Sequence, residues 1–338
     1  MSLAKIVLFG SIALFTLIGV VSLVKRSSHS SSTEVVKTQE VQMALPHREP
    51  LPVKIEAPPP PLPLEKIAPA PSSLTSENDF PMVDRIFRLF TLGPMRLPIV
   101  ETITYSSSVP WLKGRPAWIA DYAAHYQTSR HFIARSLNGK SDYLTQKVST
   151  GSRFNVFRID KKIQFYLLID VSRCKMGFYY VDLDTKERLL LKTYNVGLGR
   201  IDPHAPSGTL TPLGTYSLGN KVAIYKSGTM GLFQKQQTEM IRIFGTRWLP
   251  FDQELDQVTA PAQGYGIHGA PWREDPNSGE LVEQRSLIGA YDSDGCIRLA
   301  LEDLEELFSI VITKPTFVVI VKDFYDAKLP GVEVVAIK

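Results

Sequence analysis

The sequence predicts a mostly β domain in the C-terminal half of the chain, preceded by a small α+β unit and an N-terminal transmembrane helix. Three observations predict this arrangement. They are a long uncharged apolar run near the N-terminus, helical spacing of apolar residues between Lys113 and Phe157, and strand-like runs separated by turns from Lys161 onward. A length of 338 residues leaves room for two domains and further segments.

The N-terminal apolar run predicts a membrane anchor. Residues 6–24 form 19 consecutive positions without a charge, flanked by Lys5 and by Lys25-Arg26. That length spans a bilayer. A cleaved signal peptide has a shorter apolar core and a small-x-small cleavage site, which Ser22–Arg26 does not offer. We therefore expect residues 1–26 to anchor the chain, with a signal peptide as the alternative.

Residues 27–79 read as a linker. The segment begins with a Ser- and His-rich run and continues with many prolines, including Pro58–Pro61. Such a composition cannot bury a core and favours extended polyproline II. We expect a semi-rigid spacer between the anchor and the folded part of the chain.

Residues 80–158 are predicted to form a small module of helices and one strand. Thr128-Ser129 is a helix-start signal and Asn138-Gly139 is a stop signal. The expected elements are a short helix within Phe80–Leu97, helices at Trp118–Tyr126 and Arg130–Leu137, and a strand at Arg153–Phe157.

Residues 159–322 are predicted to form the β domain, and 323–338 a tail with further apolar residues. Alternating and continuous apolar runs bounded by turn residues indicate the strands. The expected strands are Ile163–Val171, Met176–Leu183, Arg188–Val196, Thr215–Gly219, Tyr265–His268 and Thr316–Val321, with one amphipathic helix at Leu301–Ile312.

A cysteine and a histidine carry the chemistry that the sequence suggests. Cys296 follows Gly295 in a short polar turn, and His268 precedes Gly269. A thiol is nucleophilic as its thiolate, and a positioned imidazole can take its proton. Glycine before the nucleophile lets backbone N–H groups approach a reacting carbonyl. A bridge between Cys174 and Cys296 would silence this nucleophile, so we expect both cysteines to be free.

These residues lie in a longer signature. Its segments are Gly197-Leu198-Gly199, Thr211–Tyr216, Ile267-His268-Gly269, Ser286–Gly289 and Ser293–Leu299. The set resembles the active-site signature of the L,D-transpeptidases, the YkuD family. The resemblance implies a YkuD-like β-sandwich with one or two helices, and peptidoglycan cross-linking through a cysteine acyl-enzyme. It thereby places the chain in peptidoglycan biosynthesis, cell wall organisation and cell shape.

The resemblance also implies roles for individual residues. Cys296 is the nucleophile and His268 the base, and backbone N–H groups of Asp294, Gly295 and Cys296 hold the oxyanion. Arg298 orients a substrate carboxylate or the loop, the Gly269 carbonyl orients the imidazole, and Ser293 helps to position the site. Two departures stand out: Asp294 replaces a frequent histidine, and Trp272–Arg285 reads as an inserted loop that lengthens the His268–Cys296 spacing to 28 residues. We expect the Asp294 carboxylate to point away from the thiol, and the insertion to tune substrate choice without carrying chemistry.

The module at residues 80–158 is similar to a LysM module, a family that binds the glycan strand of peptidoglycan. The expected partners are therefore peptidoglycan stem peptides and glycan strands, together with the membrane through residues 6–24. The expected location is the cell envelope, anchored in the inner membrane with the catalytic domain in the periplasm or otherwise outside the cytoplasmic membrane. The oligomeric state stays open.

Other partners and cofactors find no support. The net charge of +4 is spread along the chain without a Lys/Arg block, so no nucleic-acid partner is expected. Two cysteines far apart and scattered histidines give no closed ligand set, so no metal or other cofactor is expected. Two other functions stay open, namely an L,D-carboxypeptidase on the same scaffold and a non-catalytic peptidoglycan-binding protein.

Overall fold

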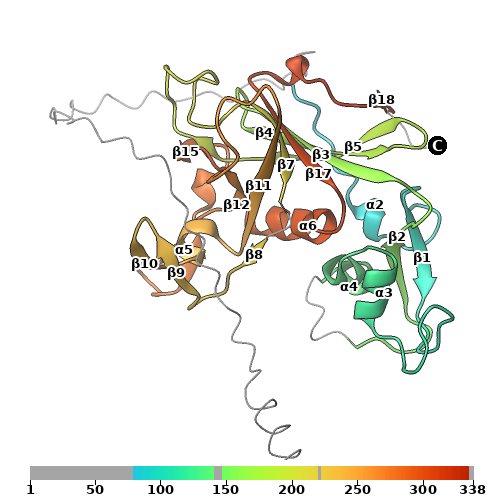
Figure 1. Cartoon of the computed structure of the whole chain (residues 1–338). Coiled ribbons are helices and arrows are strands. Elements are labelled where there is room, and N and C mark those ends of the chain that lie inside the picture. Colours follow the sequence, from blue (N-terminus) through green and yellow to red (C-terminus); the bar gives the residue numbers. More distant parts are fainter. Residues whose placement is uncertain (1–78, 141–146, 220–221, 335–338) are drawn as a thin grey trace, which may run out of the picture. The chain divides into compact units, whose positions relative to one another are not determined.

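The structure is a computed structural model that describes residues 79–140, 147–219 and 222–334 (Figure 1). The predicted anchor at residues 6–24 and nearly all of the predicted linker lie outside these residues. Within the described ranges, no helix is long and apolar enough to cross a membrane.

A ten-stranded sheet forms the centre of the C-terminal region. Nine strands follow the order β16-β12-β11-β7-β17-β3-β4-β5-β18, and β8 pairs with β11 off this path. The strands are β3 (Ile163–Asp170), β4 (Lys175–Asp182), β5 (Glu187–Asn195), β7 (Gly214–Leu218), β8 (Ala223–Ile224), β11 (Arg247–Asp256), β12 (Gly266–Gly269), β16 (Ile297–Leu299), β17 (Thr316–Val321) and β18 (Val332–Glu333). Strands β3, β4, β5 and β17 follow the predicted ranges closely, whereas β11, the longest strand, was not predicted. The C-terminal tail adds β18 beside β5.

The ten strands form one curled sheet, which with its few helices agrees with the mostly β domain that the sequence predicts (Figure 1). Strand β11 joins its two parts, because its first half pairs with β12 and its second half with β7. The β11–β7 pairing has register shifts after Phe251 and after Glu254. Such irregularities bend a strand and increase its twist, which allows a single sheet to curl.

Shorter elements surround this sheet. They are the pairs β6 (Leu198–Gly199) with β15 (Tyr291–Ser293), β9 (Met230–Phe233) with β10 (Gln236–Glu239) and β13 (Trp272–Glu274) with β14 (Leu281–Glu283), the helices α5 (Ile241–Phe244) and α6 (Leu301–Val311), and the 3₁₀ turns η1 (Arg285–Leu287) and η2 (Phe324–Asp326). Helix α6 buries Leu304, Leu307 and Phe308 completely or nearly so. Each such side chain stabilises the fold by about 1.5–3 kcal/mol.

The N-terminal module has the order β1-α3-α4-β2. Strand β1 (Val100–Thr104) pairs antiparallel with β2 (Arg153–Phe157), and α3 (Ile119–His125) and α4 (Arg130–Asn138) lie between them in the chain. Strand β1 was not predicted from the sequence. The predicted signals for α4 are confirmed, because the Ser129 hydroxyl accepts the N–H of Phe132 and Gly139 ends the helix with a φ of 79°.

The module and the sheet share one hydrophobic core. Phe132 and Phe157 of the module belong to the same buried cluster as Phe165 of β3 and Phe308 of α6. The Ser129 hydroxyl also donates a hydrogen bond to the carbonyl oxygen of Ser309 in α6. A second, smaller cluster around Tyr122 and Phe154 belongs to the module alone.

The predicted helix within Phe80–Leu97 is wrong for most of its length. Only α2 (Phe87–Phe90) is helical. Upstream of it, the backbone carbonyl of Val83 and N–H of Arg85 bond to Thr193 and Leu191, at the edge of the sheet. Backbone groups that bond to β5 cannot also form the hydrogen bonds between residues i and i−4 of an α-helix.

The predicted inserted loop is an ordered β-hairpin, β13–β14. Its Glu283 carboxylate accepts the N–H of Leu301, the first residue of α6, at 2.6 Å. Arg285 pairs with Glu302, and Glu274 with Arg242 at 2.5 Å. Ala300 at the helix N-cap has no side-chain acceptor, so the insertion supplies one.

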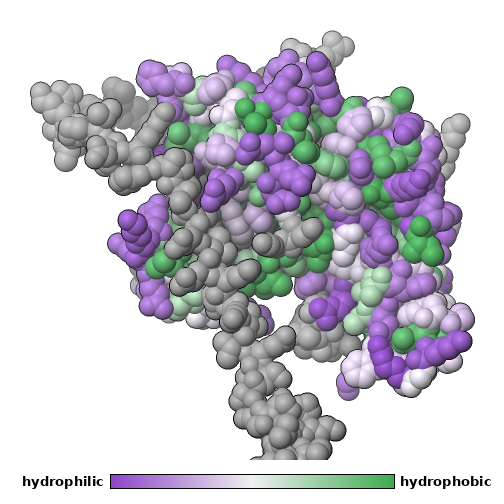
Figure 2. Space-filling view, viewed as in Figure 1, coloured by the Kyte–Doolittle hydropathy of each residue, from purple (hydrophilic) through white to green (hydrophobic). Residues whose placement is uncertain are grey.

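Hydrophilic side chains cover much of the face shown in Figure 2, with hydrophobic ones in groups between them. Several large apolar side chains are nevertheless exposed, including Trp118 at 67% and Phe87 at 54%. Isolated exposed apolar residues are ordinary in proteins, so only those beside a cavity or a cluster call for an explanation.

The contact between the hairpin and α6 gives a stability prediction. Replacing Glu283 by alanine removes the acceptor of the Leu301 N–H, and should lower the free energy of unfolding by about 1 kcal/mol in chemical denaturation. Glu280→Ala in the same hairpin is the matched control, because its side chain is exposed. Equal losses in the two variants would contradict the capping role.

Candidate active site

A parallel strand pair brings the two parts of the signature together. Strand β12 pairs with β16 so that His268 lies opposite Arg298 and Gly269 opposite Leu299. Cys296 immediately precedes β16, so the turn that carries the thiol ends beside the start of β12, the strand that carries His268. The separation of 28 positions between His268 and Cys296 leaves this register intact, because the connection forms the β13–β14 hairpin.

The imidazole of His268 is fixed by a backbone hydrogen bond. His268 is only 4% exposed, and its Nδ1 lies 2.7 Å from the carbonyl oxygen of Gly269. A carbonyl oxygen can only accept, so Nδ1 carries the proton and Nε2 is left as the acceptor. Phe244 meets the ring edge-on at 5.3 Å between centroids, and Trp248 lies at 5.7 Å.

The thiol of Cys296 packs against the same aromatic residues. Met240, Phe244 and Trp248 form a buried cluster, and the half-buried Cys296 contacts it. The sulfur lies 3.6 Å from the carbonyl oxygen of Gly264, to which the thiol donates. Nucleophile and base therefore share one apolar wall, which buries the imidazole and reduces the contact of the thiol with water.

Exclusion of water determines the resting charge state of the pair. Burial raises the pKa of Cys296 to about 12, against smaller opposing effects of the Gly266 backbone and Arg298. Burial, and then the positive charge of Arg298, lower the pKa of His268 to about 3, although the bond to Gly269 acts in the opposite direction. At neutral pH the site thus holds a neutral thiol and a neutral imidazole. This arrangement favours a neutral thiol and imidazole at rest over a thiolate–imidazolium ion pair.

Ser293 shapes the turn that presents the thiol. Its hydroxyl donates to the carbonyl oxygen of Cys296 at 2.6 Å and accepts the N–H of Gly295 at 3.1 Å. The N–H of Gly295 is therefore occupied within the turn. Among the described residues, the N–H groups of Asp294 and Cys296 have no hydrogen-bond acceptor. Of the three N–H groups expected from the sequence to hold the oxyanion, those of Asp294 and Cys296 are free to do so and that of Gly295 is not.

Glycine is required at position 295. Its φ is 118°, a conformation that residues with a side chain rarely adopt. A Cβ atom there would lie 2.5 Å from the ring of Tyr265 and 2.6 Å from the carbonyl oxygen of Leu210. The backbone before the thiol can run this close to its neighbours only without a side chain.

Asp294 is paired with a cation that the sequence analysis did not single out. Its carboxylate accepts from Arg200 at 2.5 Å, and both side chains are about half exposed or more. Asp294 raises the pKa of Cys296 only as the smallest of its causes. The signal for Arg200 was its position directly after the Gly197–Gly199 segment. Strand β6 in that segment pairs with β15, and this pairing sets Gly199 opposite Ser293.

Arg298 is engaged within the protein. Its guanidinium donates to Asp292 at 2.7 Å, and the side chain is 13% exposed. Of the two roles expected for Arg298, orienting the loop agrees with this ion pair, while a substrate carboxylate would have to compete with Asp292. Its charge also reaches both His268 and Cys296, where it disfavours an imidazolium and favours a thiolate.

Both cysteines are free, as expected. Cys174 is buried in the turn between β3 and β4, where it belongs to the main core. Within the described ranges, no group of three His, Cys, Asp or Glu residues is arranged to hold a metal ion.

Comparison with known proteins identifies the domain that carries this site. Residues 164–320 match the profile of the L,D-transpeptidase catalytic domain, YkuD. The chain carries a YkuD domain. His268, Cys296 and Arg298 all lie within the matched residues, and the YkuD domain ends with strand β17. No curated protein matches the chain.

Two solved structures show weaker similarity. Bd1075 from Bdellovibrio bacteriovorus is 13% identical over 47% of this chain and 48% of its own, with a TM-score of 0.31. The helical cell shape determining protein Pgp2 from Campylobacter jejuni is 18% identical over 50% of each chain, also with a TM-score of 0.31. The chain thus spans about half the length of these structures, and neither similarity is high enough to bear on function.

The charge state of the site gives a prediction for thiol reactivity. Alkylation of Cys296 by iodoacetamide should accelerate about tenfold per pH unit from about pH 6 to about pH 9, because only the thiolate reacts and its fraction is small throughout. Mass spectrometry of the alkylated full chain measures the rate, and Cys296→Ala gives the background from Cys174. A rate that is flat across this range would contradict the neutral pair and indicate a resting thiolate–imidazolium pair.

Proposed function

We propose that the chain is a peptidoglycan L,D-transpeptidase that works through an acyl-enzyme on Cys296. The observation that carries this proposal is the convergence, within a YkuD domain, of the Cys296 turn and the Nε2 acceptor of His268 on one apolar wall. The proposed donor is a stem tetrapeptide, from which the terminal D-residue is removed. The proposed acceptor is an amine of a second stem.

In the first step, Sγ of Cys296 attacks the carbonyl carbon that precedes the terminal D-residue. Nε2 of His268 accepts the thiol proton during the attack, since the raised pKa of Cys296 and the lowered pKa of His268 make transfer before attack uphill. The N–H groups of Asp294 and Cys296 stabilise the oxyanion. The C–N bond then breaks, the D-residue leaves with the proton from His268, and a thioester remains.

In the second step, the acceptor amine attacks the thioester carbonyl. His268 again accepts a proton, now from the amine, and Cys296 leaves as the thiol after it regains a proton. Water competes with the amine at this step. The wall of Met240, Phe244 and Trp248 restricts water around the sulfur, which favours aminolysis over hydrolysis.

We propose that the module at residues 80–158 binds glycan strands as a LysM-like unit. The order β1-α3-α4-β2 with an antiparallel strand pair supports this interpretation. The predicted anchor at residues 6–24 would hold the chain in the inner membrane of the cell envelope, with the YkuD domain in the periplasm or otherwise outside the cytoplasmic membrane.

The test is incubation of the full chain with disaccharide-tetrapeptide and, separately, with a carbapenem, followed by mass spectrometry of protein and products. We expect a covalent adduct, release of the terminal D-residue and formation of cross-linked dimers. Cys296→Ala should lose all three, and His268→Gln should lose at least about 100-fold in rate. Cys174→Ala is the matched control and should retain activity, because Cys174 lies in the main core and is not part of the Ser293–Cys296 turn.

The rival functions give different products. Monomeric tripeptide without dimers would contradict transpeptidation and indicate the L,D-carboxypeptidase, in which water replaces the amine. A folded chain with a titratable Cys296 that forms no adduct, yet sediments with peptidoglycan, would indicate the non-catalytic wall-binding protein.

A further inference from the structure

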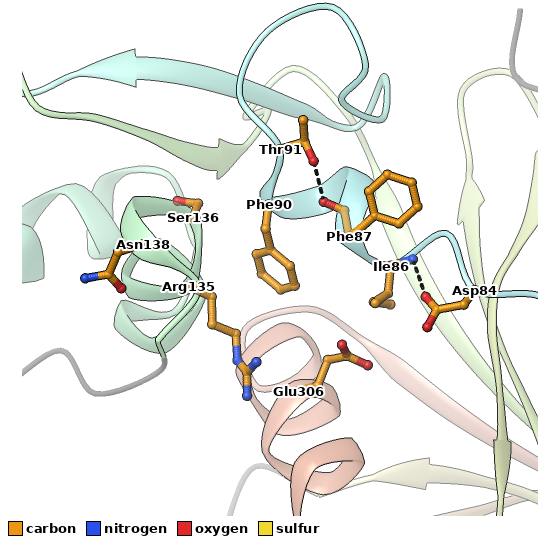
Figure 3. A pocket seen from close by; sticks show the side chains of 10 residues that line it. Asp84, Ile86, Phe87, Phe90, Thr91, Arg135, Ser136, Asn138 and Glu306 are labelled. Atoms are coloured by element: carbon orange, nitrogen blue, oxygen red, sulfur yellow. Dashed lines mark hydrogen bonds between the residues drawn. The ribbon is translucent and has the colours of Figure 1, made fainter.

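An open cavity of about 450 Å³ lies on the module side of helix α6, away from Cys296 and His268. Its lining comes from three segments: the chain around α2, the C-terminal end of α4, and Glu306 in α6. Figure 3 shows Arg135 extending from α4 toward Glu306, with Phe90 between Arg135 and Ile86. None of the residues proposed for acyl transfer lines this cavity.

Arg135 is a cation without a partner in the described part of the chain. No acceptor or carboxylate there lies within hydrogen-bond or ion-pair distance of its guanidinium, and its Nε is buried. Burial lowers the pKa of Arg135, while the charge of Glu306 acts in the opposite direction. Desolvating a cation without pairing it costs free energy. An unpaired cation beside a cavity therefore suggests that a ligand in the cavity supplies its partner.

The opposite side of the cavity is acidic. Lys192 is the cation for three carboxylates: it pairs with Glu306 at 2.7 Å and Asp303 at 3.0 Å, and reaches Asp84 at 3.8 Å. Glu306 and Asp84 both line the cavity. With Arg135 included, two cations face three carboxylates, so a purely anionic ligand would add to an existing excess of negative charge.

The cavity also has an apolar wall. Phe87 is 54% exposed beside it, and Phe90 is half-buried. A polar head group alone would leave these rings in water. A ligand with an apolar portion between its charged ends would cover them, which is a common design of small-molecule sites.

We propose that this cavity binds a zwitterionic amino acid or short peptide. Its carboxylate pairs with the Arg135 guanidinium, whose fork accommodates two parallel hydrogen bonds. Its ammonium group faces Asp84 and Glu306, so that the net charge of the cavity is unchanged on binding. Its aliphatic portion lies against Phe87 and Phe90.

This site does not depend on the acyl-transfer proposal. It is built from the module and α6, so a ligand there contacts both and stabilises their association by mass action. Blocking Cys296 should leave it intact, which separates failure of this inference from failure of the proposed function.

The experiment is calorimetric titration of the full chain, alkylated at Cys296, with three probes: trialanine, its N-acetyl form and its C-terminal amide. We expect trialanine to bind. Both capped forms should bind with an affinity lower by about tenfold or more, since each lacks one charge. Arg135→Gln should weaken trialanine by about tenfold or more. Arg130→Gln, the same change on the same helix outside the cavity, should not.

Stability of the free protein provides a second measurement. Arg135→Met removes an unpaired, partly buried charge, so its unfolding temperature without ligand should equal or exceed that of the wild type. A marked decrease would show that Arg135 is structural and overturn the proposal. No binding of trialanine to a folded wild-type chain, or binding that Arg135→Gln leaves unchanged, would also overturn it. Equal affinity for the N-acetyl form would overturn the assignment of the ammonium group.

Discussion

The parallel pairing of β12 with β16 is the constraint on which the site depends. It sets His268 opposite Arg298 and so places the turn from Ser293 to Cys296 beside the imidazole. The contacts of α6 and of the β13–β14 hairpin support this register. Helix α6 follows β16 directly and is buried in the core, and the β13–β14 hairpin holds its first turn through Glu283.

Around this strand pair, the protein shields the thiol and the imidazole from water. The aromatic wall of Phe244 and Trp248 shields the imidazole from water and partly covers the thiol, which favours the neutral form of both groups. A neutral thiol is a poor nucleophile at rest, yet it is protected from adventitious chemistry and becomes reactive as its proton moves to Nε2. The fixed hydrogen bond from Nδ1 to the Gly269 carbonyl ensures that Nε2 is the free acceptor.

The elements with strong local signals could be predicted from the sequence. The strands around Ile163–Leu183 and the helix at Leu301–Ile312 have clear periodicity, and the Ser129 and Gly139 signals mark the ends of α4. The Cys296 and His268 segments were predictable because they belong to a signature of several segments that resembles the YkuD active site.

The features that were not predicted depend on contacts between residues that lie far apart in the sequence. The backbone around Val83 and Arg85 bonds to the edge of the sheet more than 100 residues later, which no local pattern reveals. The same holds for Arg200, whose partner Asp294 is 94 positions away. The loss of the Gly295 N–H as an oxyanion donor follows from the Ser293 rotamer, which sequence does not specify. Likewise, burial of His268 and Cys296 against one aromatic wall, and hence their charge state, arises only once the sheet has curled.

The most direct test of this account is the nitrogen NMR spectrum of His268 in the full chain, labelled with ¹⁵N-histidine and assigned with His268→Gln. The account predicts a neutral ring protonated on Nδ1 from about pH 5 to about pH 8, because burial lowers its pKa far below the ordinary value near 6.5. A ring protonated on both nitrogens at neutral pH would contradict it, and would mean that Cys296 rests as a thiolate beside an imidazolium.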